Sequence, residues 1–446
     1  MDKNALTCSR PSAAGKTNQP PTDVRMRGFA RRTTVADALT WLDDHIQTLA
    51  AETVPLDRAA GRVLAGDVVS PRDVPTFDRS MMDGFAVRAA DTLDTSSYNP
   101  IELNIVGESL PGQPFSGEVE PRQAVRIMTG APIPRGADAV LPVESTEIRG
   151  QSVLAQAAVS PAKHVGRAGE DVTANSVVFA AGRVLRPQDV GVLASIGTAH
   201  VQVVHRPRVR IVVTGNELLP VGAASQPHKI YDSNGPMLTA LVRRDGGVAN
   251  HPGIVPDRPE SILAALHDDA DIVLVSGGSS VGQEDHAPVL LLEHGSLPIH
   301  GIAMRPSSPT GLGLLDGRLV VLLPGNPVSC LCAYDFFAGR AIRGCGGRAT
   351  DWPYPQVTAT LDRKIVSTIG RLDYMRVRVA EGRAEPLAVS GSSILTSTTR
   401  ADGFVLVTPD SEGYPPGAEV NVYLYDSAGE KRALPNLGAG GDTNHE

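Results

Sequence analysis

The chain has 446 residues, more than one hydrophobic core usually holds, so we expect roughly two to four domains. Hydrophobic residues make up 41% and charged residues 20%, which is typical of a folded globular protein and excludes a disordered one. The net charge of −8 comes from 41 basic and 49 acidic residues without a long basic run, and this argues against a nucleic-acid partner.

Cysteine usage indicates reduced thiols in a protein core. The four cysteines, Cys8, Cys330, Cys332 and Cys345, form no Cys-x-x-Cys pair, so their spacing does not favour a zinc site. No apolar stretch approaches the ~20 residues of a membrane span. Residues 1–30 also lack the apolar core of a secretion signal. We therefore expect a cytoplasmic protein without a membrane partner.

The first part of the chain alternates between helical and β patterns. Apolar residues recur at helical spacing over residues 34–49, which predicts an amphipathic helix, and a second short helix is expected at 57–60. From residue 71 to about 158, short apolar runs alternate with Pro and Gly turns, as in a small β domain. Pro187 opens a further predicted helix, which Gly197 ends.

Residues 208–347 predict an α/β domain with a mostly parallel sheet. The runs RVRIVVT, DIVLVSG and RLVVLLPG are continuously apolar, as in strands with both faces covered, and helical segments such as PVSCLCAYDFFAGRAIRG alternate with them. After residue 350 the strands shorten and alternate, which predicts a small β-barrel or sandwich. Residues 431–446 are polar and rich in glycine, as expected of a loose tail.

Each of the three predicted strands ends in a loop rich in glycine, serine or proline. These loops are Thr214 to Glu217, Ser276 to Gly282 and Pro324 to Ser329. Ligands of open parallel sheets bind outside the carboxyl ends of the strands, so we expect the three loops to meet at one crevice.

The composition of these loops suits a phosphate group. Glycines let backbone N–H groups approach an anion, serines add hydroxyl donors, and Pro327 is placed to open a helix whose positive end faces the anion. Tight turns alone would explain one such loop, but three at successive strand ends favour an anion site.

Acids accompany the loops at Glu217, Asp232 and Asp285. Carboxylates repel a phosphate unless a hard cation bridges them, and Mg²⁺ is the usual cation. Helix capping is the alternative for Asp232 or Asn234, because a helix is expected to start near Pro236. Two loops outside this domain, 80–86 and 166–171, each contain an acid but read as plain connectors from the residues alone.

Seven segments together resemble the molybdopterin molybdenumtransferase family, MoeA, which includes the E domain of gephyrin. The segments are SMMDGFAV, GRAGED, TGNEL, YDSNGPML, SGGSSVGQED, LPGNPVSC and TSTTRADGFVLVTPDSEG, and they follow the family order over about residues 33–425.

The resemblance implies a multidomain α/β protein. It would have an elongated α/β dimerisation domain at 32–70 and 159–204, an inserted small β domain at 71–158, a molybdopterin-binding βαβ domain at 205–348 and a C-terminal β-barrel domain at 349–430, between a disordered N-terminal tail at 1–31 and a C-terminal tail at 431–446. The resemblance also implies a homodimer with its active site at the subunit interface, to which Asp83 and Asp171 would come from the other chain.

The implied reaction transfers molybdenum from molybdate to adenylylated molybdopterin, forms molybdenum cofactor and releases AMP. Such chemistry needs a metal to polarise the phosphoanhydride and donors to hold an oxyanion. The catalytic residues would be Asp83, Asp171, Glu217, Asp232 and Asp285, of which Glu217, Asp232 and Asp285 would bind Mg²⁺. The substrate-binding residues would be Thr214, Gly215, Ser276, Gly277, Gly278, Ser280, Gly282, Pro324, Gly325, Asn326 and Pro327. Arg305 and Ser329 are the expected molybdate ligands, because Arg presents a rigid fork of donors to an oxyanion.

Two positions depart from the family pattern. Asn216 stands where the family usually has Asp, and Ser308 stands where the family motif Lys/Arg-Pro-Gly-Lys-Pro has its second Lys, whereas the first cation is kept as Arg305. A carboxylate and a cation are thus lost together, which indicates mutual compensation, altered metal use or reduced activity.

Two other functions stay open at this point. A paralogue that binds molybdopterin or molybdate as a carrier or scaffold would suit the missing lysine, whereas the five retained acids favour an enzyme. A hydrolase acting on nucleotides with the same βαβ module would not need the SMMDGFAV segment or the C-terminal ADGFVLV strand.

Overall fold

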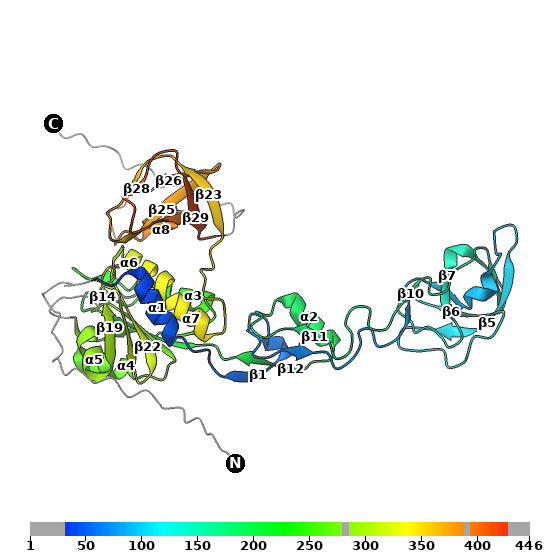
Figure 1. The fold of residues 1–446 in the computed structure, drawn as a ribbon. Helices are drawn as coiled ribbons and strands as arrows, with labels where there is room; N and C mark the ends of the chain where they lie inside the picture. Colours follow the sequence, from blue (N-terminus) through cyan, green and yellow to red (C-terminus); the bar gives the residue numbers. More distant parts are fainter. Residues whose placement is uncertain (1–31, 279–284, 388–392, 427–446) are drawn as a thin grey trace, which may run out of the picture. The chain divides into compact units, whose positions relative to one another are not determined.

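The computed structural model describes residues 32–278, 285–387 and 393–426, which form two compact units (Figure 1). One unit combines the segment up to Leu49 with the segment from Arg206 onward, and the other is Ala50–His205. The predicted tails at 1–31 and 431–446 lie outside the described residues. Among the described helices, none has the length and hydropathy of a membrane span.

The first unit contains a sheet in the order β16-β13-β18-β22-β21-β19, with β17 also paired to β13. The pairings among β16, β17, β13, β18 and β22 are parallel, and only the β21 and β19 edge is antiparallel, so the predicted mostly parallel sheet is confirmed. The strands are β13 (Arg208–Thr214), β16 (Val248–Asn250), β17 (Ile254–Val255), β18 (Ile272–Ser276), β19 (Ser296–His300), β21 (Gly311–Leu315) and β22 (Arg318–Leu323).

Helices cover both faces of this sheet (Figure 1). Val209, Ile211 and Val213 pack in one apolar cluster with α1, α3, α6 and α7, and Val212 packs in a second with α4 and α5. Both faces of β13 are therefore buried, which explains its uninterrupted apolar sequence. The helices are α1 (Val35–His45), α3 (Asn234–Arg244), α4 (Pro259–Leu266), α5 (His286–His294), α6 (Pro327–Ala333) and α7 (Gly339–Cys345).

Two predicted helices differ from the structure. The first was expected to reach residue 49, but it ends at His45 because Ile46 adopts an extended conformation, and the Leu49 N–H donates to the carbonyl of Cys345 at 2.9 Å instead. The segment from Pro327 was expected to be one helix, but a π-helical turn at Tyr334–Ala338 separates α6 from α7.

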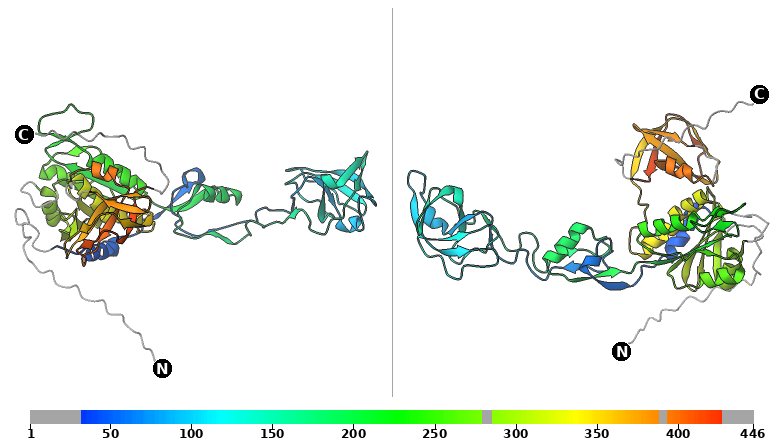
Figure 2. Two further views of the ribbon diagram at one scale, coloured as in Figure 1. Left: turned by 90° about the horizontal axis from the view of Figure 1, so that it is seen from above. Right: turned by 180° about the vertical axis from the view of Figure 1, so that it is seen from behind.

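The same unit ends in a closed five-stranded barrel, in which β25, β26, β23, β29 and β27 pair in turn and β27 closes on β25 (Figure 2). The barrel alternative of the sequence prediction is thus confirmed. Its elements are β23 (Gln356–Leu361), β24 (Ile365–Val366), β25 (Leu372–Ala380), β26 (Arg383–Pro386), α8 (Thr396–Arg400), β27 (Gly403–Val407), β28 (Gly413–Tyr414) and β29 (Glu419–Leu424). Strand β20 (Met304–Arg305), from the α/β part, pairs with β25 and joins the two parts.

The second unit holds a six-stranded sheet in the order β7-β4-β6-β5-β9-β8, several short antiparallel pairs and one α-helix that begins at Pro187 as predicted. The short helix expected at 57–60 is a 3₁₀ turn, Leu56–Arg58. The elements are β1 (Ala51–Pro55), β2 (Val68–Val69), β3 (Arg79–Ser80), β4 (Gly84–Val87), β5 (Ile101–Ser109), β6 (Gln123–Ile127), β7 (Ala139–Pro142), β8 (Thr146–Arg149), β9 (Ser152–Ala155), β10 (Val165–Gly166), β11 (Val177–Phe179), α2 (Pro187–Ser195) and β12 (His200–Val204).

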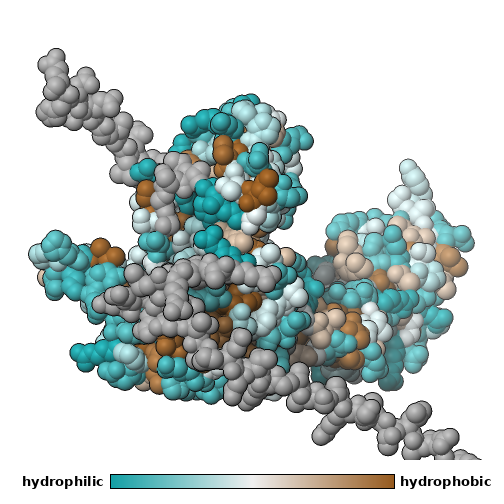
Figure 3. Space-filling view, turned by 60° about the vertical axis from the view of Figure 1, so that its left-hand side comes forward, coloured by the Kyte–Doolittle hydropathy of each residue, from teal (hydrophilic) through white to brown (hydrophobic). Residues whose placement is uncertain are grey.

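On the part of the molecule that Figure 3 leaves uncovered, hydrophobic residues form small separate groups among hydrophilic ones.

Candidate active site

A cavity of about 780 Å³ lies where β13, β18 and β22 end, and we call it the loop pocket. Eight of the predicted substrate-binding residues line it: Thr214, Gly215, Ser276, Gly277, Gly278, Gly325, Asn326 and Pro327. Glu217, Asp232 and Asp285 line it as well. Ser280 and Gly282 lie outside the described residues, and Pro324 lines a different pocket.

Glycine is required at the second of these loops. Gly277 has φ +92°, and a Cβ atom there would lie 2.0 Å from the carbonyl oxygen of Thr214. The ends of β18 and β13 can therefore approach this closely only without a side chain at residue 277.

Asn234, at the start of α3, ties two of the loops together. Its Nδ2 donates to Ser276 Oγ at 2.9 Å and to the Gly325 carbonyl at 2.8 Å. A carbonyl oxygen can only accept, so the orientation of the Asn234 amide is fixed. Its Oδ1 is buried and has no hydrogen-bond partner among the residues that the structure describes. The separation of the Ser276 and Gly325 loops thus depends on where α3 begins.

Asp232 serves both the pocket and the helix. Its Oδ1 accepts from the Gly235 N–H at 2.8 Å and its Oδ2 from His251 Nε2 at 3.2 Å. Burial opposes the charge, but the hydrogen bonds from His251 and Gly235 outweigh burial and hold the pKa of Asp232 below its ordinary value. The capping alternative therefore describes what the carboxylate of Asp232 does locally, although Asp232 also lines the loop pocket.

A fourth acid of the pocket, Asp257, was missed by the sequence analysis. It follows the two-residue strand β17, and its Oδ1 accepts from Thr214 Oγ1 at 3.1 Å. The strand before it is too short to produce a recognisable pattern, so Asp257 looked like an ordinary turn residue.

The donor set fits a metal that arrives with its own ligands. Nowhere in the described ranges do three His, Cys, Asp or Glu side chains gather closely enough to hold a metal ion, so Glu217, Asp232 and Asp285 share a pocket without forming a complete site. Mg²⁺ is commonly held by one or two carboxylates together with substrate phosphates. The pocket is suited to that kind of binding.

A second cavity, of about 370 Å³, contains the predicted molybdate ligands, and we call it the arginine pocket. It is lined by Met304, Arg305, Pro306, Ser307, Ser308, Pro309, Pro324, Asn326, Ser329, Tyr374, Met375, Arg376 and Leu387. Asn326 lines both cavities, so the loop after β22 separates them.

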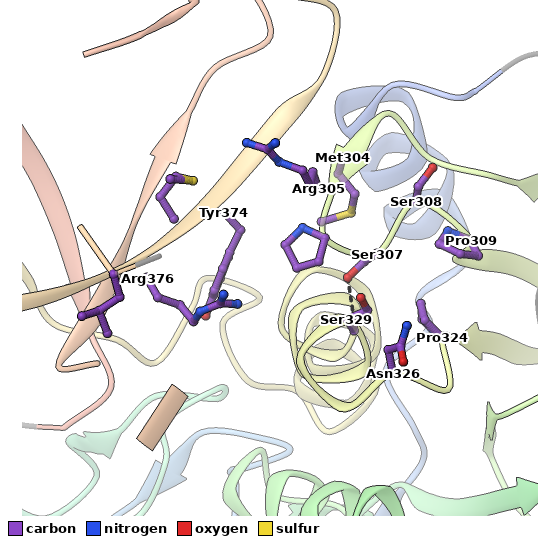
Figure 4. Close-up of a pocket in the computed structure, with 13 residues that line it drawn as sticks. Met304, Arg305, Ser307, Ser308, Pro309, Pro324, Asn326, Ser329, Tyr374 and Arg376 are labelled. Carbon is purple, nitrogen blue, oxygen red and sulfur yellow. Dashed lines mark hydrogen bonds between the residues drawn. The ribbon is translucent and has the colours of Figure 1, made fainter. Parts of the chain in front are cut away.

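Arg305 is not a free cation in this pocket. Its guanidinium forms an ion pair with the fully buried carboxylate of Asp373 and turns toward the barrel strand (Figure 4). Asp373 also pairs with Arg371 at 3.0 Å and accepts from Ser367 Oγ at 2.8 Å. Arg305 therefore stays a predicted molybdate ligand, but its guanidinium shares the single Asp373 carboxylate with Arg371.

Arg376, on β25, is the residue that the sequence analysis did not single out. Its side chain lines the arginine pocket opposite Ser329 and Asn326 (Figure 4). Arg376 is only 5% exposed, and within the described part of the chain its buried Nε has no hydrogen-bond partner and its guanidinium forms no ion pair. A buried charge without a partner is costly unless an anion compensates it.

The loop that departs from the family motif lies between these groups. Ser307 has φ +91°, which is unusual for a residue with a side chain, and its hydroxyl donates to the Ser329 carbonyl at 2.5 Å. Ser308 Oγ is buried, and no described residue forms a hydrogen bond with it. Asn216, the other departure, is exposed, and its main-chain carbonyl accepts from Lys229.

Asp83 and Asp171 belong to the second unit, and both are exposed. The N–H and hydroxyl of Thr129 donate to Asp83 Oδ1, each at 2.7 Å, and hold the pKa of this carboxyl below its ordinary value. The main-chain N–H of Asp171 donates to the Val74 carbonyl at 3.0 Å.

The segment before Asp171 is more than a plain connector. Arg167 pairs with Asp78 at 2.7 Å, and Glu170 pairs with Arg79 at 2.8 Å. These ion pairs fasten the loop to the chain beside β3.

Three of the cysteines lie in the core, as expected. Cys330, Cys332 and Cys345 are free thiols and are buried, and burial raises the pKa of Cys330 to about 12. Their environment is that of inert core residues. Cys8 lies outside the described residues.

Comparisons with known protein families match three successive stretches of the chain. Residues 210–343 match a probable molybdopterin binding domain, residues 33–197 match the MoeA N-terminal region (domain I and II), and residues 358–425 match the MoeA C-terminal region (domain IV). The chain is therefore a multidomain protein with a molybdopterin-binding type of α/β domain.

Similarity to individual proteins shows to which family within this class the chain belongs. The chain is 38% identical to molybdopterin molybdenumtransferase 2 of Mycobacterium tuberculosis over 337 residues, 73% of this chain and 82% of the relative. It is 31% identical to molybdopterin molybdenumtransferase of Staphylococcus aureus over 410 residues, 90% of this chain and 97% of the relative. A molybdopterin biosynthesis MoeA protein of Pyrococcus horikoshii superposes with a TM-score of 0.78 at 31% identity, over 89% of this chain and all of that chain. The chain belongs to the MoeA family of molybdopterin molybdenumtransferases, which confirms the resemblance seen in the sequence.

Proposed function

We propose that the chain inserts molybdenum from molybdate into adenylylated molybdopterin, forms molybdenum cofactor and releases AMP. The loop pocket binds the pterin phosphate end of the substrate, and the arginine pocket binds molybdate. The observation that carries the proposal is the buried Arg376, whose Nε has no hydrogen-bond partner among the described residues, in a cavity that shares Asn326 with the phosphate-type loops.

The residues of the loop pocket bind phosphate in this proposal, and those of the arginine pocket bind molybdate. In the loop pocket, the N–H groups around Gly215, Gly277 and Gly325 approach the phosphate, and Ser276 adds a hydroxyl. In the arginine pocket, Arg376 supplies the charge that molybdate needs, with Ser308 and Ser329 beside it. Arg305 shapes this site through its pair with Asp373 rather than as a free cation.

Glu217 and Asp285 would hold Mg²⁺ together with the substrate phosphates, with Asp232 beside them. When bound, Mg²⁺ supplies a Lewis acid that polarises the phosphoanhydride. The acids of the pocket then orient water, and the loop N–H groups hold the developing negative charge on phosphate.

The proposal includes a cytoplasmic homodimer. Asp83 and Asp171 lie in the second unit, both exposed, and a partner subunit would bring them to the loop pocket as the family resemblance implies. Nothing in the relatives' names favours the alternative of a non-catalytic carrier.

AMP release tests the proposal directly. The full chain is mixed with adenylylated molybdopterin, molybdate and Mg²⁺, and AMP is measured over time. We expect turnover that stops when EDTA removes Mg²⁺, and Asp285→Ala should lower it by about 100-fold or more while the fold is kept, because loop acids rarely hold a core together. Tight binding of the substrate without any AMP would instead support the carrier.

A further inference from the structure

A histidine that does not line the loop pocket supports Asp232. His251 directly follows β16, and its Nε2 lies 3.2 Å from Asp232 Oδ2. A carboxylate can only accept, so Nε2 carries the hydrogen in this contact. The side chains of His251 and Asp232 are 15% and 5% exposed, so the contact is largely shielded from water.

The pair packs closely against the first turn of α3. A Cβ atom on Gly235 would lie 2.2 Å from His251 Nε2 and 2.4 Å from Asp232 Oδ2. The Gly235 N–H also donates to the other oxygen of Asp232 at 2.8 Å. His251, Asp232 and Gly235 thus fit together only while residue 235 has no side chain, and the three fix the position of this turn.

The first turn of α3 also contains Asn234, which forms hydrogen bonds to two of the substrate loops. Asn234 precedes Gly235 and donates to Ser276 Oγ and to the Gly325 carbonyl. A shift of the turn would move this amide and with it the separation of the two loops. His251 is therefore linked to the loops through Asp232, Gly235 and Asn234 without touching the cavity.

We propose that His251 is a positioning residue for substrate binding. Through Asp232 it fixes the first turn of α3, so that Asn234 holds the Ser276 and Gly325 loops at the separation that binds the phosphate end of molybdopterin. This inference rests on the proposed function, because that function supplies the ligand.

Binding of molybdopterin, followed by pterin fluorescence, tests this role. His251→Ala should raise Kd about tenfold, the effect of losing one hydrogen bond to a charged group, while the binding stoichiometry stays unchanged. His251→Gln keeps an N–H donor that can reach Asp232 and should recover most of the affinity. Gly235→Ala breaks the same pair from the other side and should give a similar loss, with little further loss in the double variant.

A matched control comes from another histidine in contact with a carboxylate. His267 lies 3.5 Å from Asp316 on the surface, and neither residue lines the loop pocket. His267→Ala should leave Kd unchanged. A comparable loss in this control would overturn the proposal.

Two further results would overturn the positioning role of His251 without contradicting the proposed function. If His251→Ala lowers the stoichiometry or the melting temperature while Kd stays at the wild-type value, His251 serves stability alone. If His251→Ala does not fold, Gly235→Ala replaces it in the test, and an unchanged Kd in that variant would also show that His251 serves stability alone. If the wild-type chain itself does not bind molybdopterin, the proposed function fails first and the inference falls with it.

Discussion

The loop pocket and the arginine pocket share one residue, Asn326, but they are built in opposite ways. The loop pocket is lined by glycine-containing loops and by the carboxylates of Glu217, Asp232, Asp257 and Asp285. The arginine pocket is lined by residues from two parts of the same unit and contains two arginines and no carboxylate, and among the described residues the buried Nε of Arg376 has no hydrogen-bond partner. Backbone donors suit a phosphate that is already accompanied by a metal, whereas a bare oxyanion needs a full positive charge. The comparison therefore supports our proposal that the two substrates bind in separate pockets.

The largest effect is expected from breaking the loop pocket alone. Gly277→Ala places a methyl group where only 2.0 Å separates it from the Thr214 carbonyl, at φ +92°. The Ser276 loop must then move, and molybdopterin affinity should fall by about 100-fold, since displacement and backbone strain each cost on the order of 1–3 kcal/mol. Equilibrium binding of molybdopterin and of molybdate, measured separately, checks this.

Gly370→Ala is the control for backbone strain. Gly370 has a similar φ of +89°, but a Cβ atom there meets nothing within 4 Å. Its substitution should leave both affinities unchanged. Equal losses of both ligands in Gly277→Ala would contradict the division into two pockets.

The second expected effect concerns the arginine pocket. Arg376→Met keeps much of the side-chain volume and removes the unpartnered charge, so molybdate affinity should fall by roughly 10- to 100-fold while molybdopterin affinity stays the same. The melting temperature should stay level or rise, because a buried charge without a partner is removed. Isothermal titration with molybdate and a thermal melt measure the two quantities.

Arg378→Met provides the comparison within the same strand, because Arg378 lies on β25 but does not line the pocket. It should bind molybdate like the wild type. Unchanged molybdate binding in Arg376→Met would remove the assignment of this cavity to the oxyanion.

The two pockets also differ in how far the sequence predicted them. The strands β13, β18 and β22 were predicted, since continuous apolar runs followed by Gly and Ser depend only on local sequence, whereas β16, β17, β19 and β21 were not. The end of α1 was not predicted correctly, because it depends on the hydrogen bond between Leu49 and Cys345, which lie almost three hundred residues apart in the chain.

In the arginine pocket, Arg305 and Ser329 were predicted but Arg376 was not, because its role also depends on contacts between distant parts of the chain. Arg305 belongs to the family motif, but its ion pair with Asp373 becomes visible only when β20 and β25 pair. Arg376 matters because its buried Nε has no hydrogen-bond partner among the described residues, and the absence of a partner has no local sequence pattern. Asp257 was missed because its strand is two residues long.

The last prediction concerns Ser308, which departs from the family motif, and here we expect only a small change in molybdate affinity. Ser308 lines the arginine pocket, and its hydroxyl is buried without a partner. Ser308→Lys adds a second cation near Arg376 and should raise molybdate affinity about two- to fivefold, because desolvation of the ammonium cancels part of the Coulomb gain. Ser308→Met fills similar space without charge, and it should leave the affinity unchanged or lower it. If Lys and Met behave alike at residue 308, the pocket gains nothing from a second charge, and Arg376 alone accounts for its affinity.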